Sequence, residues 1–247
     1  MLAKREALKV AARSIERRLN EDRSDHAGPS RACSCGQEAR YAGRLKKTFV
    51  SAVGPVTLER AYYCCPSCHQ GLCPRDVAMG LERQSLSPAV LRMVGHVAAR
   101  VSFAESEVLL QELAGVRVEA KQVERAAEAL GAAVAEDELR VVEEPAVRTT
   151  LPSTLYLGMD GTGVPMRRKE VEGRAGKAED GIAKTREAKL CTVWSAESRN
   201  EKGAPVRDPG SVTYSAAIES AAMNDTDDDL SDFAKRVERE ARRRGFL

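Results

Sequence analysis

Cys33-Ser34-Cys35-Gly36 and Cys65-Pro66-Ser67-Cys68 enclose the stretch of sequence that decides the fold of the first part of the chain. Between these cysteine pairs, β-branched and aromatic residues fill the runs 47–53 and 56–63 on either side of Gly54-Pro55. This pattern predicts a β-hairpin with its turn at Gly54-Pro55. A hairpin with a cysteine pair at each end is the plan of a zinc ribbon, in which four thiolates form a closed tetrahedral site for Zn²⁺.

The sequence therefore predicts a structural zinc site with the ligands Cys33, Cys35, Cys65 and Cys68. Cys64, His69 and Cys73 are alternative ligands, and a cluster of buried free thiols is the alternative to a metal site. A closed four-cysteine site supplies folding energy to a segment that is too small to build its own core. It indicates a recognition module rather than a catalytic one.

The composition sets the class of the protein. A chain of 247 residues is long enough for two domains, or for one core with small modules. No run approaches the roughly 20 apolar residues of a membrane helix, and the N-terminus has no apolar signal segment. We therefore expect a cytoplasmic protein without a membrane partner. Its seven cysteines then serve as metal ligands or free thiols rather than as disulfides.

Helical patterns flank the cysteine module. Apolar residues at helical spacing predict a helix over 2–20, and its basic residues form either a surface for nucleic acid or a solvated face. After the module, helices are expected from Ser87-Pro88, over 103–113 and over 119–134.

The last two of these helices resemble a helix-turn-helix. Its reading helix would offer Lys121, Gln122 and Arg125 to a DNA groove. The alternative is a helix pair that only packs, because glutamates on the same helix repel phosphates.

Asp160 is the candidate catalytic residue. It ends the apolar run 155–159 and precedes a glycine, so it is either a Mg²⁺ ligand at the edge of a sheet or a turn aspartate. The elements expected after it are a polar insertion over 166–189, strands over 190–196 and 211–214, and helices over 215–223 and 232–244. This order of strand, strand, strand and helix predicts the first half of a ribonuclease H-like domain.

The polar insertion is either a DNA-phosphate contact or a solvated loop; its candidate DNA-binding residues are Arg167, Arg168, Lys169, Arg174 and Lys177.

Cleavage by two Mg²⁺ ions needs bridging carboxylates that hold the ions about 4 Å apart. Asp180, Asp208 and the aspartates of 225–229 fit turns and helix caps better than a metal site. Asp160 is therefore expected to stand without a second catalytic carboxylate.

Several motifs together carry a family resemblance. They are Cys33-Ser34-Cys35-Gly36, Arg60-Ala61-Tyr62-Tyr63, Cys65-Pro66-Ser67-Cys68, Pro74-Arg75-Asp76, Asp160-Gly161-Thr162-Gly163-Val164-Pro165-Met166, Gly173-Arg174-Ala175-Gly176-Lys177, Asp180-Gly181, Lys184-Thr185-Arg186-Glu187, Lys189-Leu190 and Arg207-Asp208-Pro209-Gly210-Ser211-Val212-Thr213-Tyr214. In this combination the chain resembles bacterial insertion-sequence DDE transposases of the ISKra group.

The resemblance implies cutting and joining of double-stranded DNA at transposon ends, with Mg²⁺ and three acidic residues, of which Asp160 matches the first. In the family the second Asp and the Glu come later than position 247. The resemblance thus implies the N-terminal part of a transposase that is inactive alone: a truncated gene, a pseudogene product or one frame of a split gene. It also implies a bacterial, nucleoid-associated protein that forms homo-oligomers or associates with an intact transposase. The alternative is a catalytically dead, zinc-dependent DNA-binding protein that inhibits such an enzyme.

We therefore predict a multidomain α+β protein. Its segments are an amphipathic helix and linker (1–30), a zinc-ribbon-like module (31–80), a helix-turn-helix-like module (81–135), a linker (136–153) and an incomplete ribonuclease H-like α/β domain (154–247).

Overall fold

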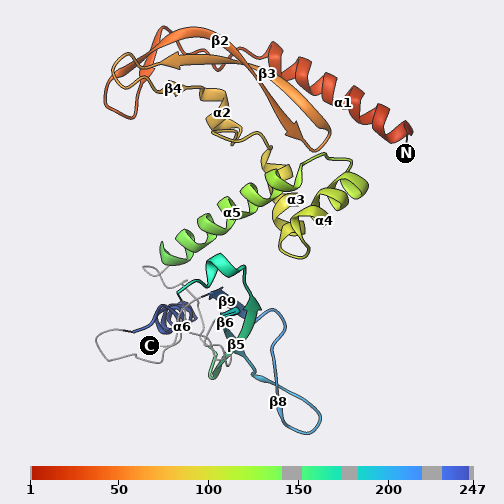
Figure 1. Cartoon of the computed structure of the whole chain (residues 1–247), viewed down its shortest axis with the longest axis vertical. Helices are drawn as coiled ribbons and strands as arrows, with labels where there is room; N and C mark the ends of the chain where they lie inside the picture. Colours follow the sequence, from red (N-terminus) through yellow and green to blue (C-terminus); the bar gives the residue numbers. More distant parts are fainter. Residues whose placement is uncertain (1, 141–151, 174–182, 219–229, 245–247) are drawn as a thin grey trace. The chain divides into compact units, whose positions relative to one another are not determined.

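The computed structural model describes residues 2–140, 152–173, 183–218 and 230–244 (Figure 1). The chain is a mixed α+β protein with antiparallel sheets. It divides into two compact units, residues 1–135 and residues 136–247, which are described separately below. None of the described helices combines the length and the apolar character that a membrane span requires.

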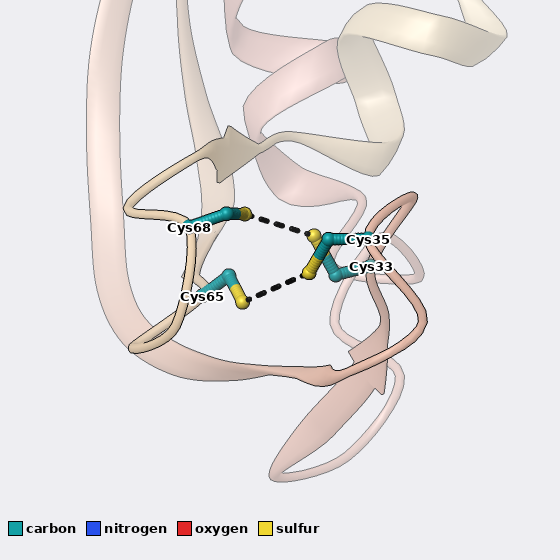
Figure 2. Close-up of side chains that lie close together, drawn as sticks. All are labelled: Cys33, Cys35, Cys65 and Cys68. Carbon is teal, nitrogen blue, oxygen red and sulfur yellow. Dashed lines mark hydrogen bonds between the residues drawn. The ribbon is translucent and has the colours of Figure 1, made fainter.

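The first unit contains a four-stranded antiparallel sheet in the order β1-β2-β3-β4. Its strands are β1 (Ser30–Ala32), β2 (Glu38–Ser51), β3 (Gly54–Cys64) and β4 (Gly71–Leu72). Strands β2 and β3 form the long hairpin of Figure 1, and the four cysteines lie in loops at the end away from its turn (Figure 2). The hairpin and the cysteine cluster at its end confirm the prediction at this level.

The hairpin turn lies at Ala52 and Val53, because Ser51 pairs with Gly54. The predicted turn at Gly54-Pro55 is therefore wrong by two residues, and both of these residues belong to β3. The hydroxyl of Ser51 explains the shift, since it donates to the Gly54 carbonyl at 2.7 Å and accepts from the Val53 N–H at 3.2 Å. Gly54 has a φ of +115°, which only glycine adopts readily.

Helix α1 (Leu2–Glu21) packs on the hairpin, as Figure 1 shows, and its bounds agree with the predicted helix. Its apolar stripe meets the hairpin core; the shared cluster contains Ala12, Leu19, Phe49, Val56, Leu58 and Leu81. Polar side chains of α1 also bind the free edge of β3. The Thr57 N–H donates to Glu16 at 2.7 Å, and the Glu59 N–H donates to Asn20 at 2.8 Å. These bonds satisfy backbone groups that an exposed strand edge would leave unpaired.

The rest of the first unit is helical. Its elements are α2 (Pro74–Ala78), α3 (Pro88–Ala98), α4 (Phe103–Leu109), a π-helical turn η1 (Leu110–Ala114) and α5 (Ala120–Arg140). Ser87 and Ser102 cap α3 and α4 by accepting from the N–H groups three residues later. The structure confirms the helix predicted to start at Ser87-Pro88 and the helices predicted over 103–113 and 119–134. However, α5 continues to Arg140, so the predicted linker over 136–153 begins too early.

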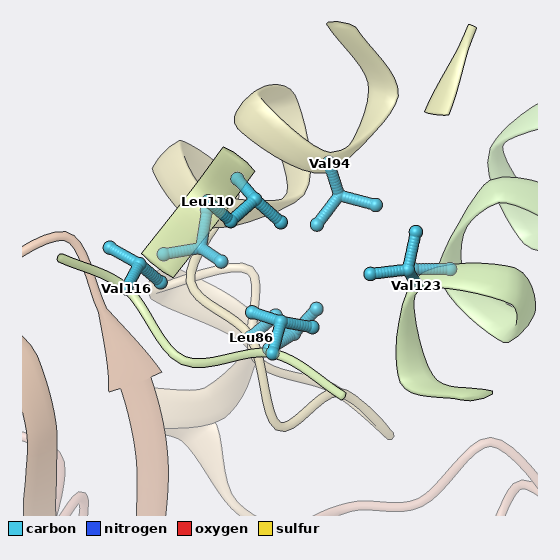
Figure 3. Close-up of a cluster of buried hydrophobic side chains, with 8 residues drawn as sticks. Leu86, Val94, Leu110, Val116 and Val123 are labelled. Carbon is cyan, nitrogen blue, oxygen red and sulfur yellow. The ribbon is translucent and has the colours of Figure 1, made fainter. Parts of the chain in front are cut away.

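A valine-rich core holds these helices together (Figure 3). Val94 of α3, Leu110 of η1 and Val123 of α5 belong to one buried cluster with Val116, which lies in the connection between η1 and α5. Gly115 ends η1 with a φ of +73°, and the Val116 N–H then donates back to the Leu110 carbonyl at 3.1 Å. The connection between α4 and α5 is thus part of the core rather than a solvated loop.

The second unit contains a three-stranded antiparallel sheet in the order β5-β6-β9. Its elements are β5 (Leu155–Pro165), the 3-10 turn η2 (Arg168–Glu170), β6 (Thr185–Ser195), the hairpin β7 (Ser198–Arg199) and β8 (Pro205–Val206), β9 (Thr213–Ile218) and α6 (Asp232–Arg243). Three sequence-based boundaries are corrected here. Strand β5 does not end at Asp160, β6 begins five residues before Leu190, and residues 215–218, predicted as helix, belong to β9.

Cross-strand pairing explains the longer strands. Residues 155–165 pair with 195–185 without interruption, so Asp160 lies opposite Leu190 in the middle of β5. Gly161 lies under the Glu187 side chain, which would have to move if a Cβ atom were added, because that atom would lie 2.5 Å from the Glu187 carboxylate oxygen. Gly161 lies within the paired strand and therefore does not mark a strand end.

Helix α6 has the predicted bounds but buries a different face. Arg236, Glu240 and Arg244 are buried at four-residue spacing, whereas the apolar residues of the helix, Phe233, Val237 and Ala241, are half-buried. The sheet offers partners for these charges: Thr213 donates to Glu240 at 2.6 Å, and Arg244 donates to the Ser211 carbonyl at 2.6 Å. Arg236 and Arg244 are thus buried charged residues and not part of the exposed surface of the helix.

Candidate metal centre and DNA-contact residues

The four predicted zinc ligands lie together in the structure. Figure 2 shows their sulfur atoms pointing toward one another, and all four sulfurs lie within 4.8 Å of each other. Cys33 Sγ is 3.5 Å from Cys68 Sγ, and Cys35 Sγ is 3.7 Å from Cys65 Sγ. They form the only group of three or more potential metal ligands found among the described residues.

Two turns of similar construction bring the sulfurs together. In the first, the Cys33 N–H donates to the Gln37 carbonyl and the Gly36 N–H donates to the Cys33 carbonyl. In the second, the Cys65 N–H donates to the Gln70 carbonyl and the His69 N–H donates to the Cys65 carbonyl. Arg40 pairs with Cys64 across β2 and β3, so both turns lie at the same end of the hairpin.

The spacing of the sulfurs fits a tetrahedral metal ion. Four thiolates around Zn²⁺, each at about 2.3 Å, lie roughly 3.8 Å apart along the edges of the tetrahedron. The two sulfur separations of 3.5 and 3.7 Å are close to this value without any movement of the chain. Sulfur donors are those that Zn²⁺ and other soft metal ions prefer. The four cysteines could therefore hold a metal ion such as zinc.

The backbone around the cluster favours thiolates at two positions. The N–H groups of Cys68 and Ser67 bind the Cys65 sulfur and lower its pKa to about 6. The Cys35 N–H likewise lowers the pKa of Cys33. The Gln70 N–H acts in the same direction on Cys68, but desolvation and the neighbouring cysteine sulfurs prevail and raise its pKa to about 12. Without a cation the four groups must share protons, whereas a divalent cation would compensate four thiolates together.

The alternative ligands lie outside this cluster. His69 is exposed and adopts a left-handed conformation, with a φ of 57°, that closes the second turn. The Cys64 thiol contacts the Cys65 carbonyl at 4.0 Å, and burial raises the pKa of Cys73. The cysteine cluster therefore consists of the four residues that the paired spacing predicts.

A small apolar core surrounds the cluster. Ala39, Ala61 and Tyr63 are buried there together with Cys65. The Tyr63 hydroxyl accepts from the Ala27 N–H at 2.9 Å and donates to the Gly28 carbonyl at 3.2 Å, which ties the linker after α1 to the sheet. A core of this size supports few residues without help, so a bound metal would contribute directly to folding.

Buried charges next to this core were not predicted. Asp25 accepts from the Ala61 N–H at 2.6 Å and from Arg44 at 2.9 Å, and Arg75 lies 3.6 Å away. Burial acts to raise the pKa of Asp25, but these hydrogen bonds and cations together lower it. A bulge between Tyr41 and Arg44 directs the arginine inward.

A second group joins α2 to the hairpin. Asp76 accepts from Arg60 and, at 3.2 Å, from Lys47, and all three side chains are largely buried. Arg75 also donates to the Asp22 carbonyl, at 2.7 Å, after the end of α1. The only sequence signal was the presence of Arg60, Arg75 and Asp76 in the quoted motifs. Their contacts in the structure are with other parts of the first unit.

Among the described residues, Asp160 belongs to no group of acidic side chains that could hold a metal ion. Its side chain is exposed and accepts from its own neighbour, the Gly161 N–H, at 2.8 Å. The Glu187 side chain lies over Gly161. It is therefore on the opposite face of the sheet from the Asp160 side chain. Asp208 accepts four hydrogen bonds, from Ser195, Ser198 and the Glu197 N–H, and these lower its pKa. The described residues therefore do not complete a Mg²⁺ site at Asp160.

The predicted DNA-contact residues differ in their surroundings. Lys121 pairs with Glu124 at 2.6 Å, and the Gln122 amide donates to the Ser85 hydroxyl at 2.9 Å, whereas Arg125 is exposed. Arg167, Arg168 and Lys169 are exposed after β5. Arg174 and Lys177 lie outside the described residues, as do Asp180 and the aspartates of 225–229.

Comparison with known proteins adds no family assignment. No protein-family model matches the chain, and no curated protein matches it.

Proposed function

We propose that the chain is a zinc-dependent DNA-binding protein of the insertion-sequence DDE transposase type. The observation that carries this proposal is the cluster of Cys33, Cys35, Cys65 and Cys68 at the end of a β-hairpin. Zn²⁺ bound there would fix the two turns and the short strands beside them, and it would supply structure rather than chemistry. The zinc-ribbon-like module would then present its surface to the DNA backbone.

Exposed cations near the module support DNA as the partner. Arg31 and Arg40 flank the first cysteine turn on β1 and β2. Arg13 and Arg18 lie on the exposed part of α1, which packs on the same hairpin. These four arginines are exposed and make no ion pair with other described residues. Unpaired arginines of this kind are suited to neutralise phosphates and release counterions.

The second unit supports the transposase assignment through its order of elements. Three antiparallel strands in the order β5-β6-β9 precede α6, and Asp160 is exposed on the first of them. This is the arrangement expected for the beginning of a ribonuclease H-like domain with its first catalytic Asp. Cleavage by two metal ions needs further carboxylates. We therefore assign DNA binding, and not cleavage, to the described residues, with strand cleavage and joining depending on acids from elsewhere.

A binding experiment tests the zinc and DNA parts together. Fluorescence anisotropy with a labelled duplex from the DNA that flanks the gene should give salt-sensitive binding, which a zinc chelator abolishes. Arg31→Ala and Arg40→Ala should each reduce the slope of log affinity against log salt by roughly 1. Arg17→Ala is the matched control, because Arg17 already lies near Glu21. Equal binding with and without chelator would refute the role of the zinc module.

A cleavage assay separates binding from catalysis. The chain alone, with Mg²⁺, should leave a supercoiled plasmid intact, since the described residues supply a single exposed carboxylate at Asp160. Nicking that Asp160→Ala abolishes would overturn the assignment of binding without cleavage. Inhibition of an intact transposase by the added chain would favour the second candidate function, a regulator that occupies transposon ends.

A further inference from the structure

Among the described elements, helix α6 covers one face of the sheet β5-β6-β9, and side chains on the other face are exposed. Cys191 and Val193 of β6 and Ser215 of β9 are buried on the face that α6 covers. The alternate residues point the other way. On that face Tyr214 of β9 keeps 62% of its surface exposed, and Asp160 of β5 is exposed as well.

Aromatic rings line the face opposite α6. Tyr156 and Trp194 pair across β5 and β6, and their rings stack with centroids 5.7 Å apart and planes 11° apart. The Arg207 guanidinium lies 4.8 Å from the centre of the Trp194 ring. Gly158 leaves room for this ring, because a Cβ atom there would lie 3.0 Å from Trp194. The position of the two stacked rings is therefore fixed by the pairing of β5 with β6 and by the space above Gly158.

Tyr214 extends the row of aromatic residues. It pairs with Thr192, which lies between Trp194 and Leu190 on the same face of β6. Asp160 pairs with Leu190, so it lies next along this face. From Tyr156 to Asp160 the strand rises about 13 Å, at roughly 3.3 Å per residue. The rings and the carboxylate thus fall within the length of a few nucleotides.

We propose that this face binds single-stranded DNA by stacking unpaired bases on Tyr214, beside the Tyr156–Trp194 stack and Arg207. Exposed rings next to an arginine are the means by which proteins hold unpaired bases, since every base offers a π face for stacking. The proposal rests on the proposed function for the choice of DNA, and it adds the strand state of the ligand. It places unpaired nucleotides beside Asp160, where a strand would be cut or joined in a complete enzyme.

The test uses the full chain loaded with zinc and a labelled thymidine oligonucleotide of about 12 nucleotides, within the usual length range of such sites. Trp194 is the only tryptophan in the sequence, so its emission reports on this face. We expect the oligonucleotide to change Trp194 emission and the blunt duplex of the same length to leave it unchanged. Tyr214→Ala should weaken oligonucleotide binding at least about fivefold, whereas Tyr214→Phe, which keeps the ring, should bind like the wild type.

Two results would overturn the proposal: equal affinity of Tyr214→Ala and Tyr214→Phe, or an equal emission change with the duplex. Folding is not at risk, because Tyr214 is exposed. The zinc-dependent duplex assay is independent of this one. A chain that binds the oligonucleotide through Tyr214 but fails the duplex assay would support this proposal and refute the proposed function, and the reverse result would do the opposite.

Discussion

Asp76→Ala is expected to cause the largest loss of stability in the first unit that does not involve the cysteines. Asp76 accepts from Arg60 and from Lys47, and the exposed fractions of the Asp76, Arg60 and Lys47 side chains are 11%, 9% and 18%. The variant leaves two largely buried cations without their anion. Breaking a buried pair in this way costs about 3–5 kcal/mol of unfolding free energy.

An exposed ion pair supplies the matched control. Arg17 and Glu21 lie 4.0 Å apart on α1, with side chains 77% and 68% exposed. Arg17→Ala should therefore change the unfolding free energy by no more than about 0.5 kcal/mol.

Urea denaturation of the zinc-loaded chain, followed by far-UV circular dichroism, measures both variants. Trp194 emission serves as an internal reference, since Trp194 lies in the second unit and its transition should not move. A loss below about 1 kcal/mol for Asp76→Ala, or equal losses for the two variants, would refute the reasoning from burial.

Two further predictions concern the cysteine cluster and the second sheet. Zinc binding at pH 7 should release fewer than four protons, because the pKa of Cys65 is about 6 and the pKa of Cys33 is also lowered, so thiolate is already present before the metal binds. The number of protons released should rise toward about four at pH 5, where Cys65 is protonated. Calorimetry of zinc binding in buffers of different ionisation enthalpy measures this number. Release that does not depend on pH would contradict the lowered pKa. Gly158→Ala should cost about 1–3 kcal/mol and shift Trp194 emission, because the new Cβ would lie 2.8 Å from the Thr192 hydroxyl and 3.0 Å from the Trp194 ring. Its control is Gly131→Ala in α5, where nothing lies within 4 Å, which should stabilise the chain by up to about 1 kcal/mol. Unchanged emission in Gly158→Ala would show that the ring does not pack on this glycine.

The helices α1, α3 and α6 were predictable because their signals are local, whereas the helix predicted over 215–223 was wrong where β9 extends to Ile218. The apolar spacing in α1, the Ser87-Pro88 start of α3 and the Ser231 cap of α6 each lie within or next to one element. The cysteine pairs were equally informative, since two turns at the ends of one hairpin must meet. For these features the chain carries the necessary information within about 20 to 40 residues.

Strand ends and buried charges depend on partners that are distant in sequence. The glycine after Asp160 predicts a strand end there, yet pairing with β6 extends β5 to Pro165. Arg236 reads as a surface residue on a helical wheel, but it donates to the Ser215 hydroxyl at 2.8 Å and is buried. Only the position of the partner strand decides such cases. Periodicity shows which residues share a face of a helix, and not what that face meets.

Whether the cluster of Cys33, Cys35, Cys65 and Cys68 binds a metal ion is the central question, and Co²⁺ substitution answers it most directly. One Co²⁺ per chain should bind, with the intense visible absorption and the thiolate charge-transfer bands of a tetrahedral four-sulfur site. Cys65→Ser should lose these bands, whereas Cys64→Ser, a change of the adjacent cysteine that lies outside the cluster, should keep them. Weak octahedral absorption in the wild type, or equal spectra for the two variants, would contradict the account.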